Sequence, residues 1–366
     1  MASAPAINIG KRAYPLLAAV LLAALAACSG SATSTSSATA LSATIPGPTG
    51  PLESSSISVE AVPTADEAGL YIANDLGYFK KEGLTVNITA TGGGELAIGD
   101  LNDKKTQIVA GNYVSFIQAQ IAGTANLRVI ANGSQMQPGN QALYVLPGSK
   151  FGTIDDLVKH HATIGVNTLN NIGTLLVGSL LADNGYSLND ITLVPGTVAT
   201  DPTLNPFVNL LGLLAKGKID AAWLPEPFGT IAQESGAVKL ADFDQGSLQN
   251  FPIGAYVANT TWVQSHPNTV AAFLHALQEG QEVADTDRAQ VEQSLITNTL
   301  IPNKFTPQQS QQIASLLTLD TYPLTMDVST IQRVADSMFQ FGVDGKNISA
   351  PYQMINMIQP EPGMIR

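Results

Sequence analysis

The sequence predicts an α/β fold with two lobes joined by two hinge strands. The prediction rests on two strand-helix-strand units, one beginning at Ile57 and the other at Ala162. Each unit combines short β-rich runs with a helical stretch followed by glycine, the residue that favours a helix C-terminus. A unit of this kind places two parallel strands beside their crossover helix, so two separate copies indicate two sheets.

The first unit opens with an alternating run at residues 57 to 62, which predicts a strand. A helix is predicted for residues 67 to 76, and Gly77 suits its C-terminal end. Residues 84 to 88 are β-rich again and predict the second strand. The first lobe is therefore expected to be α/β, with a right-handed connection between these strands.

The second unit has the same order. Residues 162 to 166 predict a strand, residues 167 to 171 a polar turn and residues 191 to 194 the return strand. Between the turn and the return strand, a helix is expected to end at Asn184, with Gly185 after it.

Two further apolar runs, residues 142 to 146 and 255 to 258, lie outside these units. We interpret them as the two hinge strands at which the chain passes between lobes. This interpretation assigns residues 57–143 and 257–366 to the first lobe and residues 144–256 to the second.

The N-terminal residues predict export. Lys11 and Arg12 form a positive region, an unbroken apolar stretch follows at residues 15 to 27, and the single cysteine is Cys28. The apolar stretch is shorter than the roughly 20 residues that a membrane-spanning helix needs. We therefore predict a lipoprotein signal peptide over residues 1 to 27, with a lipid on Cys28 that anchors the protein at the cell membrane on its extracytoplasmic face. The alternative is an ordinary secretory signal in which the cysteine occurs by chance.

Residues 28 to 56 are rich in Ser, Thr, Ala, Pro and Gly, with Glu53 as their single acidic residue. Such a composition does not bury enough apolar area to offset the entropy lost on ordering. We therefore predict a disordered tether between the lipid and the folded lobes.

The chain carries 29 acidic and 17 basic residues, a formal net charge of -12. This charge disfavours binding to nucleic acids and to anionic lipid head groups. With Cys28 committed to lipid, no thiol is left for a disulfide, a zinc-thiolate site or an iron-sulfur cluster. We expect no metal, no cofactor and no catalytic residue.

Residues 68 to 84, AGLYIANDLGYFKKEGL, resemble the signature of the nitrate/sulfonate/taurine family of ABC-transporter substrate-binding proteins. The resemblance continues in four later segments, at residues 153–157, 214–222, 223–228 and 266–273. It implies the fold of periplasmic binding proteins, a small-molecule ligand in a cleft between the lobes, and delivery to an ABC permease with its ATPase. The lipoprotein signal agrees with that expectation, because a lipid keeps an exported binding protein at the cell surface.

In both strand-helix-strand units the loop before the helix lies at the carboxyl end of a strand, where ligands of open α/β sheets bind. Free N–H groups at the helix N-termini favour an anion there, so an acidic chain can bind nitrate or a sulfonate without an arginine cluster. The candidate ligand-binding residues are Glu67, Tyr71, Gly93, Asn112, Tyr113, Gln135, Asn170, Asn171, Gly173, Thr174, Trp223 and Glu226.

Structural roles compete with ligand binding at several candidates. Trp223, like Tyr71, encloses an organic part of the ligand, or it packs in the core. Glu226 accepts a hydrogen bond from a ligand amine or ring nitrogen, or it acts as a structural cap beside Pro227. Gly93 lets backbone approach the ligand, or it belongs to an ordinary loop. Because no arginine is placed in the cleft, amidine and pyrimidine compounds stay open as ligands beside the anions.

An enzyme and a sensor are the alternatives to a transport protein. Pyrimidine-synthesising proteins of thiamine metabolism resemble this family but depend on a cysteine-rich iron motif, whereas the single cysteine here lies in the signal. The catalytic motifs G-x-S-x-G and H-E-x-x-H do not occur in the chain. A lipoprotein that senses a ligand without transporting it would keep the same fold. We therefore expect a binding protein rather than an enzyme.

Overall fold

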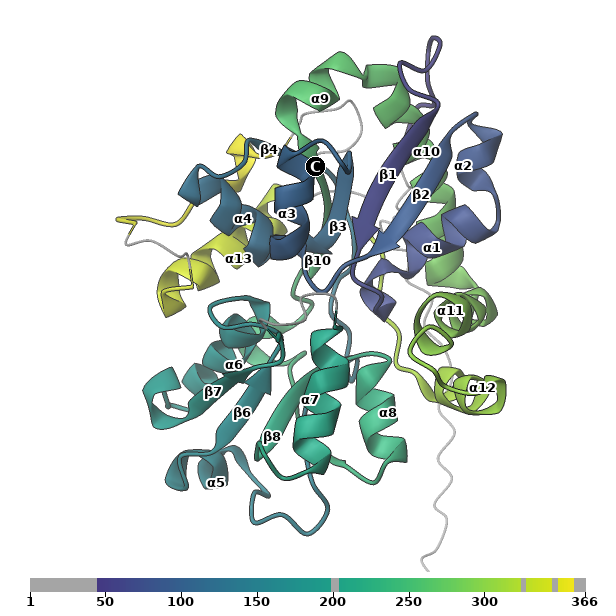
Figure 1. Cartoon of the computed structure of the whole chain (residues 1–366). Helices are drawn as coiled ribbons and strands as arrows, with labels where there is room; N and C mark the ends of the chain where they lie inside the picture. Colours follow the sequence, from purple (N-terminus) through teal and green to yellow (C-terminus); the bar gives the residue numbers. More distant parts are fainter. Residues whose placement is uncertain (1–44, 199–203, 324–326, 344–347, 359–366) are drawn as a thin grey trace, which may run out of the picture. The chain divides into compact units, whose positions relative to one another are not determined.

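The computed structural model describes residues 45–198, 204–323, 327–343 and 348–358. The predicted signal peptide and Cys28 lie outside these residues. Within the described ranges, no helix combines the length and the apolar character needed to cross a bilayer. The described strands form two five-stranded sheets with helices packed against them (Figure 1).

The first sheet contains β1 (Ser56–Ala61), β2 (Thr85–Ala90), β3 (Ile108–Asn112), β4 (Leu127–Asn132) and β10 (Gly254–Asn259). Their order is β2-β1-β3-β10-β4. β1 is parallel to β2 and β3, with Ile57 opposite Val86 and Val59 opposite Ile108. β10 runs antiparallel to both β3 and β4.

The second sheet contains β5 (Gln141–Val145), β6 (Thr163–Val166), β7 (Thr192–Pro195), β8 (Ala221–Pro225) and β9 (Val238–Asp242). Their order, β7-β6-β8-β5-β9, repeats the arrangement of the first sheet. β6 is parallel to β7 and β8, and β5 runs antiparallel to β8 and β9. The prediction of two α/β lobes is therefore confirmed.

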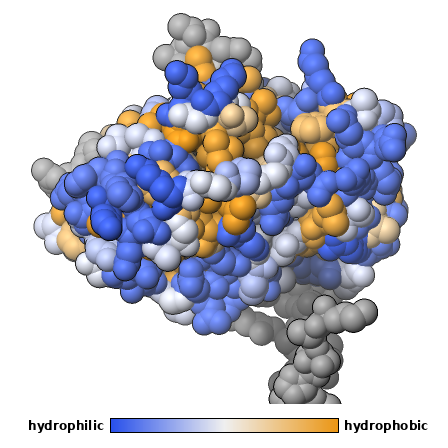
Figure 2. Space-filling view, turned by 90° about the horizontal axis from the view of Figure 1, so that it is seen from below, coloured by the Kyte–Doolittle hydropathy of each residue, from blue (hydrophilic) through white to orange (hydrophobic). Residues whose placement is uncertain are grey.

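The hydrophobic core is densest at the middle of each sheet. Nearly every residue of β3 and β10 is buried, as is every residue of β5 and β8, whereas the edge strands β2, β7 and β9 are partly exposed. Central strands that are covered by helices on both faces are expected to be apolar throughout, whatever their direction. On the face shown in Figure 2, hydrophilic residues dominate and scattered apolar areas interrupt them.

Both predicted strand-helix-strand units are present. In the first unit, α1 (Ala68–Asp75) follows a short 3₁₀ helix, η1 (Ala65–Glu67). In the second unit the helix is α6 (Ile172–Asp183). Gly77 and Gly185 follow these helices with φ of 75° and 81°, a left-handed backbone that glycine adopts without steric cost.

The other helices cover the sheets and extend the chain beyond β10. They are α2 (Tyr78–Lys81), α3 (Gly94–Asn102), α4 (Tyr113–Ala122), α5 (Ile154–Lys159), α7 (Pro206–Ala215), α8 (Phe228–Glu234), α9 (Thr260–Ser265), α10 (Pro267–Thr286), α11 (Arg288–Leu295), α12 (Pro307–Leu316) and α13 (Val328–Phe341). Short 3₁₀ or π turns are η2 (Leu188–Asp190), η3 (Gly246–Leu248), η4 (Ile296–Leu300) and η5 (Met354–Asn356).

The contact between α1 and α10 depends on two glycines. A Cβ added at Gly69 would lie 2.6 Å from Cγ of Gln281. A Cβ added at Gly280 would lie 2.7 Å from Cβ of Ala73 and would clash with the carbonyl oxygen of Gly69. Since protein interiors are packed as closely as organic crystals, these helices approach one another at a distance that only glycine allows.

The predicted hinge strands are β5 and β10, and each is paired within a single sheet. The chain crosses between the sheets in residues 133–140 and 243–253, which precede these two strands. A third segment joins the crossings, because Gln135 and Thr321 exchange backbone hydrogen bonds of 2.9 and 3.2 Å. Gln135 also forms a bridge with Pro252.

The helices after β10 contact elements of both lobes and not only those of the first sheet. α12 contacts α8, which follows a strand of the second sheet, and α13 contacts both α4 and α6. The residue boundaries of the two lobes, with all of residues 257–366 in the first lobe, therefore stay a prediction.

Residues 45–55, which the sequence assigned to the disordered tether, lie along α10. Glu53 accepts hydrogen bonds from the backbone N–H of Thr269 at 2.9 Å and of Asn268 at 3.2 Å, at the start of that helix. Slight burial acts to raise the pKa of Glu53, but these hydrogen bonds and one from the Asn268 side chain lower it to about 2. Earlier in the chain, the N–H of Ile45 donates to Oε1 of Gln278 in α10 at 2.7 Å. The prediction of a tether up to residue 56 is thus wrong for this part, because a carboxylate at a helix N-terminus fixes it.

Candidate functional site

A cavity of about 40 Å³ lies where strand ends of the two sheets meet. It is bordered by loops that follow β1, β2 and β6, by the ends of β3 and β8, and by the start of the antiparallel strand β10. The lining residues are Val62, Thr64, Asp66, Glu67, Gly92, Gly93, Gly111, Asn112, Asn167, Ile172, Phe207, Trp223, Pro225, Ile253 and Gly254. This is the position at which open α/β sheets bind ligands.

A larger hollow of about 520 Å³ lies at the other end of the first sheet. Gln107, directly before β3, and Asn259, at the end of β10, are among its lining residues. Because ligands of such sheets bind beyond the carboxyl ends of the parallel strands, the smaller cavity is the better candidate.

Two adjacent carboxylates enter the cavity from η1. Asp66 accepts hydrogen bonds from the hydroxyl of Thr64 at 2.8 Å, from Ser134 at 3.3 Å and from the Gln141 amide at 3.2 Å. Burial raises the pKa of Asp66 to about 6, and these neutral donors only partly oppose the rise. The site therefore holds a carboxyl group that changes its charge slightly below neutral pH.

Glu67 is the more buried of the two, with 1% of its surface exposed. Burial raises its pKa well above the usual value, the charge of Asp66 raises it further, and a hydrogen bond with Tyr256 lowers it. Its Oε2 atom has no hydrogen-bond partner among the described residues. Buried polar atoms are nearly always paired in native proteins, so this oxygen marks an unsatisfied position in the cavity.

The opposite side of the cavity is aromatic. Phe207 and Trp223 meet edge to face, with ring centroids 5.4 Å apart. The indole Nε1 of Trp223 donates to Oε1 of Gln141 at 3.0 Å, which fixes the ring. The same Gln141 amide donates to Asp66, so one side chain connects the acidic and the aromatic sides.

In the first lobe, the N-terminus of α4 is occupied by a side chain of the protein itself, whereas the starts of η1, α1 and α3 carry no side-chain cap from the described residues. Oδ1 of Asn112 accepts from the N–H of Ser115 at 3.0 Å and thereby caps α4. Glu95 lies in the first turn of α3, and its carboxylate accepts from the Ser115 hydroxyl at 3.1 Å. Burial raises the pKa of Glu95, while hydrogen bonds with its own backbone and with Ser115 lower it.

The N-terminus of α6 in the second lobe is occupied in the same way. Oδ1 of Asn171 accepts from the N–H of Ile172 at 2.8 Å, and Oδ1 of Asn167 accepts from the N–H of Gly173 at 3.2 Å. At α6, N–H groups that were expected to hold an anion are therefore already bonded to side chains, and an anion would have to displace them. At the start of α1, the other position expected to attract an anion, no described side chain caps the helix.

Four of the candidate residues from the sequence line the cavity: Glu67, Gly93, Asn112 and Trp223. Whether they touch a ligand stays a prediction. The other candidates, here called outer candidates, are not among the lining residues: Tyr71, Tyr113, Gln135, Asn170, Asn171, Gly173, Thr174 and Glu226.

Several of these outer candidates have structural partners. The Tyr113 hydroxyl donates to Asn132 at 2.8 Å, and Tyr71 is 6% exposed on α1. Glu226 caps α8, because its carboxylate accepts from the N–H and the hydroxyl of Thr230 at 3.0 and 2.9 Å. Burial raises the pKa of Glu226 to about 7, although the hydrogen bonds with Thr230 act to lower it.

The remaining outer candidates lie at the junction of the lobes and on α6. Asn171 donates to the Ser115 hydroxyl at 3.0 Å, and the carbonyl of Asn170 accepts from Gln118 of α4. Gly173 leaves room for Trp223, since an added Cβ would lie 2.6 Å from the indole ring. Thr174 is buried on α6, and its hydroxyl has no partner among the described residues.

Sequence reasoning missed Asp66, Asn167, Phe207 and Gln141. Asp66 forms an acidic pair with Glu67 at a helix start, and Asn167 opens the polar turn, so both carried a local signal. Phe207 and Gln141 lie in apolar segments far from both loops, where no pattern separates a lining residue from a core residue.

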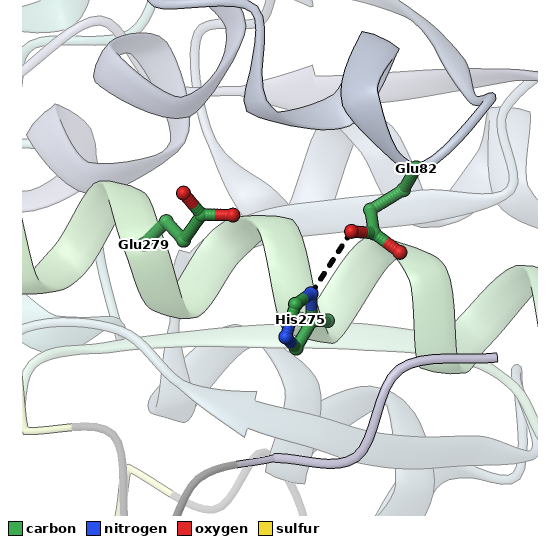
Figure 3. Close-up of side chains that lie close together, drawn as sticks. All are labelled: Glu82, His275 and Glu279. Carbon is green, nitrogen blue, oxygen red and sulfur yellow. Dashed lines mark hydrogen bonds and ion pairs between the residues drawn. The ribbon is translucent and has the colours of Figure 1, made fainter.

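A second group of titratable side chains lies on the first lobe, away from the cavity. Glu82, His275 and Glu279 can each offer one ligand atom, and these atoms lie within 4.8 Å of one another (Figure 3). Nδ1 of His275 is 3.0 Å from Glu82, and Glu279 is 3.4 Å from Nζ of Lys81. Because Lys81 already supplies a positive charge, we interpret the group as an ion pair of Lys81 with Glu279 and a hydrogen bond between His275 and Glu82, which hold α2 against α10.

Two α/β sheets with one shared strand order, and a cavity where their strand ends meet, define the fold class of periplasmic binding proteins. The family model described as NMT1/THI5 like matches residues 64–287. The chain therefore belongs to the NMT1/THI5-like family.

Known proteins with related folds agree with this class. The alkanesulfonate-binding protein SsuA from Xanthomonas axonopodis pv. citri, bound to MOPS, matches with a TM-score of 0.67 at 16% identity, over 84% of this chain and 99% of that chain. The periplasmic nitrate-binding protein NrtA from Synechocystis PCC 6803 matches with a TM-score of 0.56 at 14% identity, over 67% and 66%. The resemblance to sulfonate and nitrate binding proteins is confirmed, and both neighbours are binding proteins rather than enzymes.

One curated protein is similar to this chain in sequence. The nitrate import ATP-binding protein NrtC of Synechocystis sp. (strain PCC 6803) is 25% identical over 257 residues, which is 65% of this chain. The chain spans only 36% of that protein's length.

Proposed function

We propose that this protein is the solute-binding component of an ABC importer, which binds a small nutrient in the interlobe cavity and delivers it to a permease with its ATPase. The observation that carries the proposal is the cavity at the strand ends, lined from both sheets, in a chain of this family. The nitrate, sulfonate or taurine class that the sequence suggested and other small organic nutrients are the candidate cargo.

The proposal includes the cellular location. A signal peptide over residues 1 to 27 and a lipid on Cys28 would place the lobes at the outer face of the membrane, where a permease opens. The test is metabolic labelling with a radioactive fatty acid. Label is expected on the unaltered protein and not on Cys28→Ser, and labelling of both would contradict the anchor.

Binding is coupled to lobe closure in this proposal. Crossings at residues 133–140 and 243–253 are the segments that would bend, and the permease would recognise the closed form. Contacts that opening would break include the bond of Asn171 to Ser115 and the bond of the Ala65 N–H to the Glu226 carbonyl at 2.9 Å.

The first test is a thermal-shift screen of the purified protein against nitrate, taurine, alkanesulfonates, aromatic sulfonates, thiamine pyrimidines, amidines and riboflavin. A ligand at 100 times its dissociation constant stabilises a protein by about 2.7 kcal/mol, which raises the Tm by a few degrees. A shift with one class supports a binding protein, and no shift with any class speaks against the proposal.

Uptake by cells separates transport from sensing. Deletion of the gene is expected to abolish uptake of the ligand that shifts the Tm, and the intact gene is expected to restore it. Unchanged uptake in the deletion strain would favour a sensor that binds the ligand without delivering it.

A further inference from the structure

We infer that the cargo is a small organic cation whose N–H groups bind Asp66 and Glu67, as an amidinium or a primary ammonium does. The inference rests on the proposed function, since it takes the interlobe cavity as the cargo site. Carboxylates, nitrate and sulfonates fit this cavity less well. The reasons are the hydrogen bonds that its lining offers, the charge of the lining, the state of the helix N-termini and the aromatic rings on one side.

The first reason is the unpaired oxygen of Glu67. This side chain lines the cavity, is 1% exposed, and leaves Oε2 without a hydrogen-bond partner among the described residues. A ligand N–H would satisfy that oxygen directly. The oxygens of nitrate and of a sulfonate are acceptors only, so they would leave Oε2 unsatisfied unless Glu67 were protonated.

The second reason is the charge of the lining. Neither Asp66 nor Glu67 forms an ion pair with a described Lys, Arg or His. No basic residue is present among the described residues that line the cavity. Two further buried acids, Asp320 and Glu226, interact with this pair. Burial, together with the charges of Asp66, Glu226 and Glu67, raises the pKa of Asp320 well above its usual value. The charge of Lys239 acts on Glu226, but no cation is among the groups that shift the pKa of Asp66 or Glu67. A bound cation would supply the positive charge that these two carboxyls lack.

The third reason is the state of the helix N-termini. Asn112 and Glu95 accept from the backbone N–H and the hydroxyl of Ser115 in the first turn of α4, and Asn167 and Asn171 accept from backbone N–H groups at the start of α6. Two helix starts that could attract an anion are thus filled by acceptors from the protein itself, and the start of η1 and α1 carries the carboxyls of Asp66 and Glu67.

The fourth reason is the aromatic side of the cavity. Phe207 and Trp223 line it, and Trp223 is held by Gln141, the side chain that also bonds Asp66. Aromatic faces attract cations through the ring quadrupole, most strongly when the cation is desolvated. One end of an organic cation can therefore face carboxylates while its remainder packs on aromatic rings.

The inferred cargo has a distinctive pH dependence. Groups that face Glu67 and Asp66 are Tyr71, Tyr256, Tyr322, Asp320 and Glu226. A bound cation favours the charged form of the carboxyls, so binding releases protons and the affinity weakens as the pH falls through about 6, the pKa of Asp66. An anion that needs protonated carboxyls would take up protons and bind more tightly at low pH.

Isothermal titration calorimetry of the full chain with matched probes tests the inference. The probes are acetamidinium against acetate and benzamidinium against benzoate, because the members of each pair share a shape and differ in charge. We expect binding of a cationic member and none of its anionic counterpart. Titrations in buffers of different ionisation enthalpy are expected to reveal proton release, and the Kd is expected to rise by up to about tenfold per pH unit below pH 6 for each proton released.

A variant locates the binding group. Glu67→Gln is expected to weaken binding of the cationic probe by about 30-fold or more, since it removes one partner of a buried charged pair. Glu279→Gln makes the same chemical change at the ion pair with Lys81, away from the cavity, and is expected to leave the Kd unchanged. If Glu67→Gln does not fold, Asp66→Asn is tested in its place. Proton release is measured on the unaltered protein, so this part of the test does not depend on a variant.

The outcomes separate the inference from the proposed function. If an anion or a neutral solute binds while both cations do not, or if binding takes up protons, the inference is overturned and the proposed function stands. If neither these probes nor any solute of the thermal-shift screen binds to the folded protein, both are overturned.

Discussion

The two lobes have the same strand order but bring different chemistry to the cavity. The first lobe supplies the carboxylates Asp66 and Glu67, whereas the second supplies the rings of Phe207 and Trp223. Repetition of the sheet brings equivalent strand ends together, and the loops at those ends determine what each lobe contributes. A shared fold therefore predicts where the site lies and leaves its chemistry to a few side chains.

The largest expected effect comes from the aromatic side. Trp223→Ala is expected to lower the free energy of unfolding by about 3–5 kcal/mol, because it empties a buried position and removes the bond to Gln141. This loss is measured by urea unfolding, with circular dichroism as the probe. The matched control is Trp262→Ala on the first lobe, where the ring is only partly buried and stacks on His266. Equal losses for the two variants would contradict the assigned difference in burial.

The second largest effect is a pH dependence of the free energy of unfolding, which is expected from Glu226 in the second lobe. Its pKa is raised from 4.5 to about 7 in the folded protein, so the native state binds the proton more tightly than the unfolded chain. The free energy of unfolding should therefore fall as the pH rises from about 4.5 to about 7, by up to about 3 kcal/mol from this group. Glu226→Gln should remove that part of the slope in urea titrations between pH 4.5 and 8. A slope unchanged in the variant would show that other carboxyls cause it.

In the first lobe, the close contact of α1 with α10 gives a smaller effect. Gly280→Ala is expected to cost about 1–3 kcal/mol of unfolding free energy, because its methyl group overlaps the Gly69 carbonyl and Ala73. Gly212→Ala in α7 of the second lobe is the control, since no atom lies within 4 Å of its added Cβ. This control should be neutral or gain up to about 1 kcal/mol. An equal loss in both variants would mean that the overlap of the Gly280 methyl group with α1 does not explain the result.

The smallest effect compares one cap from each lobe. Asn112→Ala and Asn171→Ala each remove a helix N-cap, which costs about 1 kcal/mol in urea unfolding. Asn171 also bonds Ser115 of the other lobe, so its loss should additionally increase the radius of gyration in X-ray scattering by favouring the open form. An equal radius for both variants would show that this bond does not hold the lobes together.

Local patterns in the sequence were sufficient for the fold. Alternation at residues 57 to 62 and the glycines at 77 and 185 predicted the units that the structure contains, because helix ends and strand faces depend on neighbouring residues. The tether prediction failed at residues 45–55 for the opposite reason. Glu53 is ordered by Asn268 and Thr269, which are distant in sequence.

The sequence alone determined the class of this protein, an α/β chain with two lobes and an acidic composition, and it predicted a ligand site at the strand ends. Only the tertiary structure decided which side chains line that site and in what electrostatic state. It joined Asp66 to the distant Trp223 through Gln141, and it filled the N-termini of α4 and α6 with the chain's own acceptors. Burial and pairing across long stretches of sequence set the charge of such groups, and neither can be read from neighbouring residues.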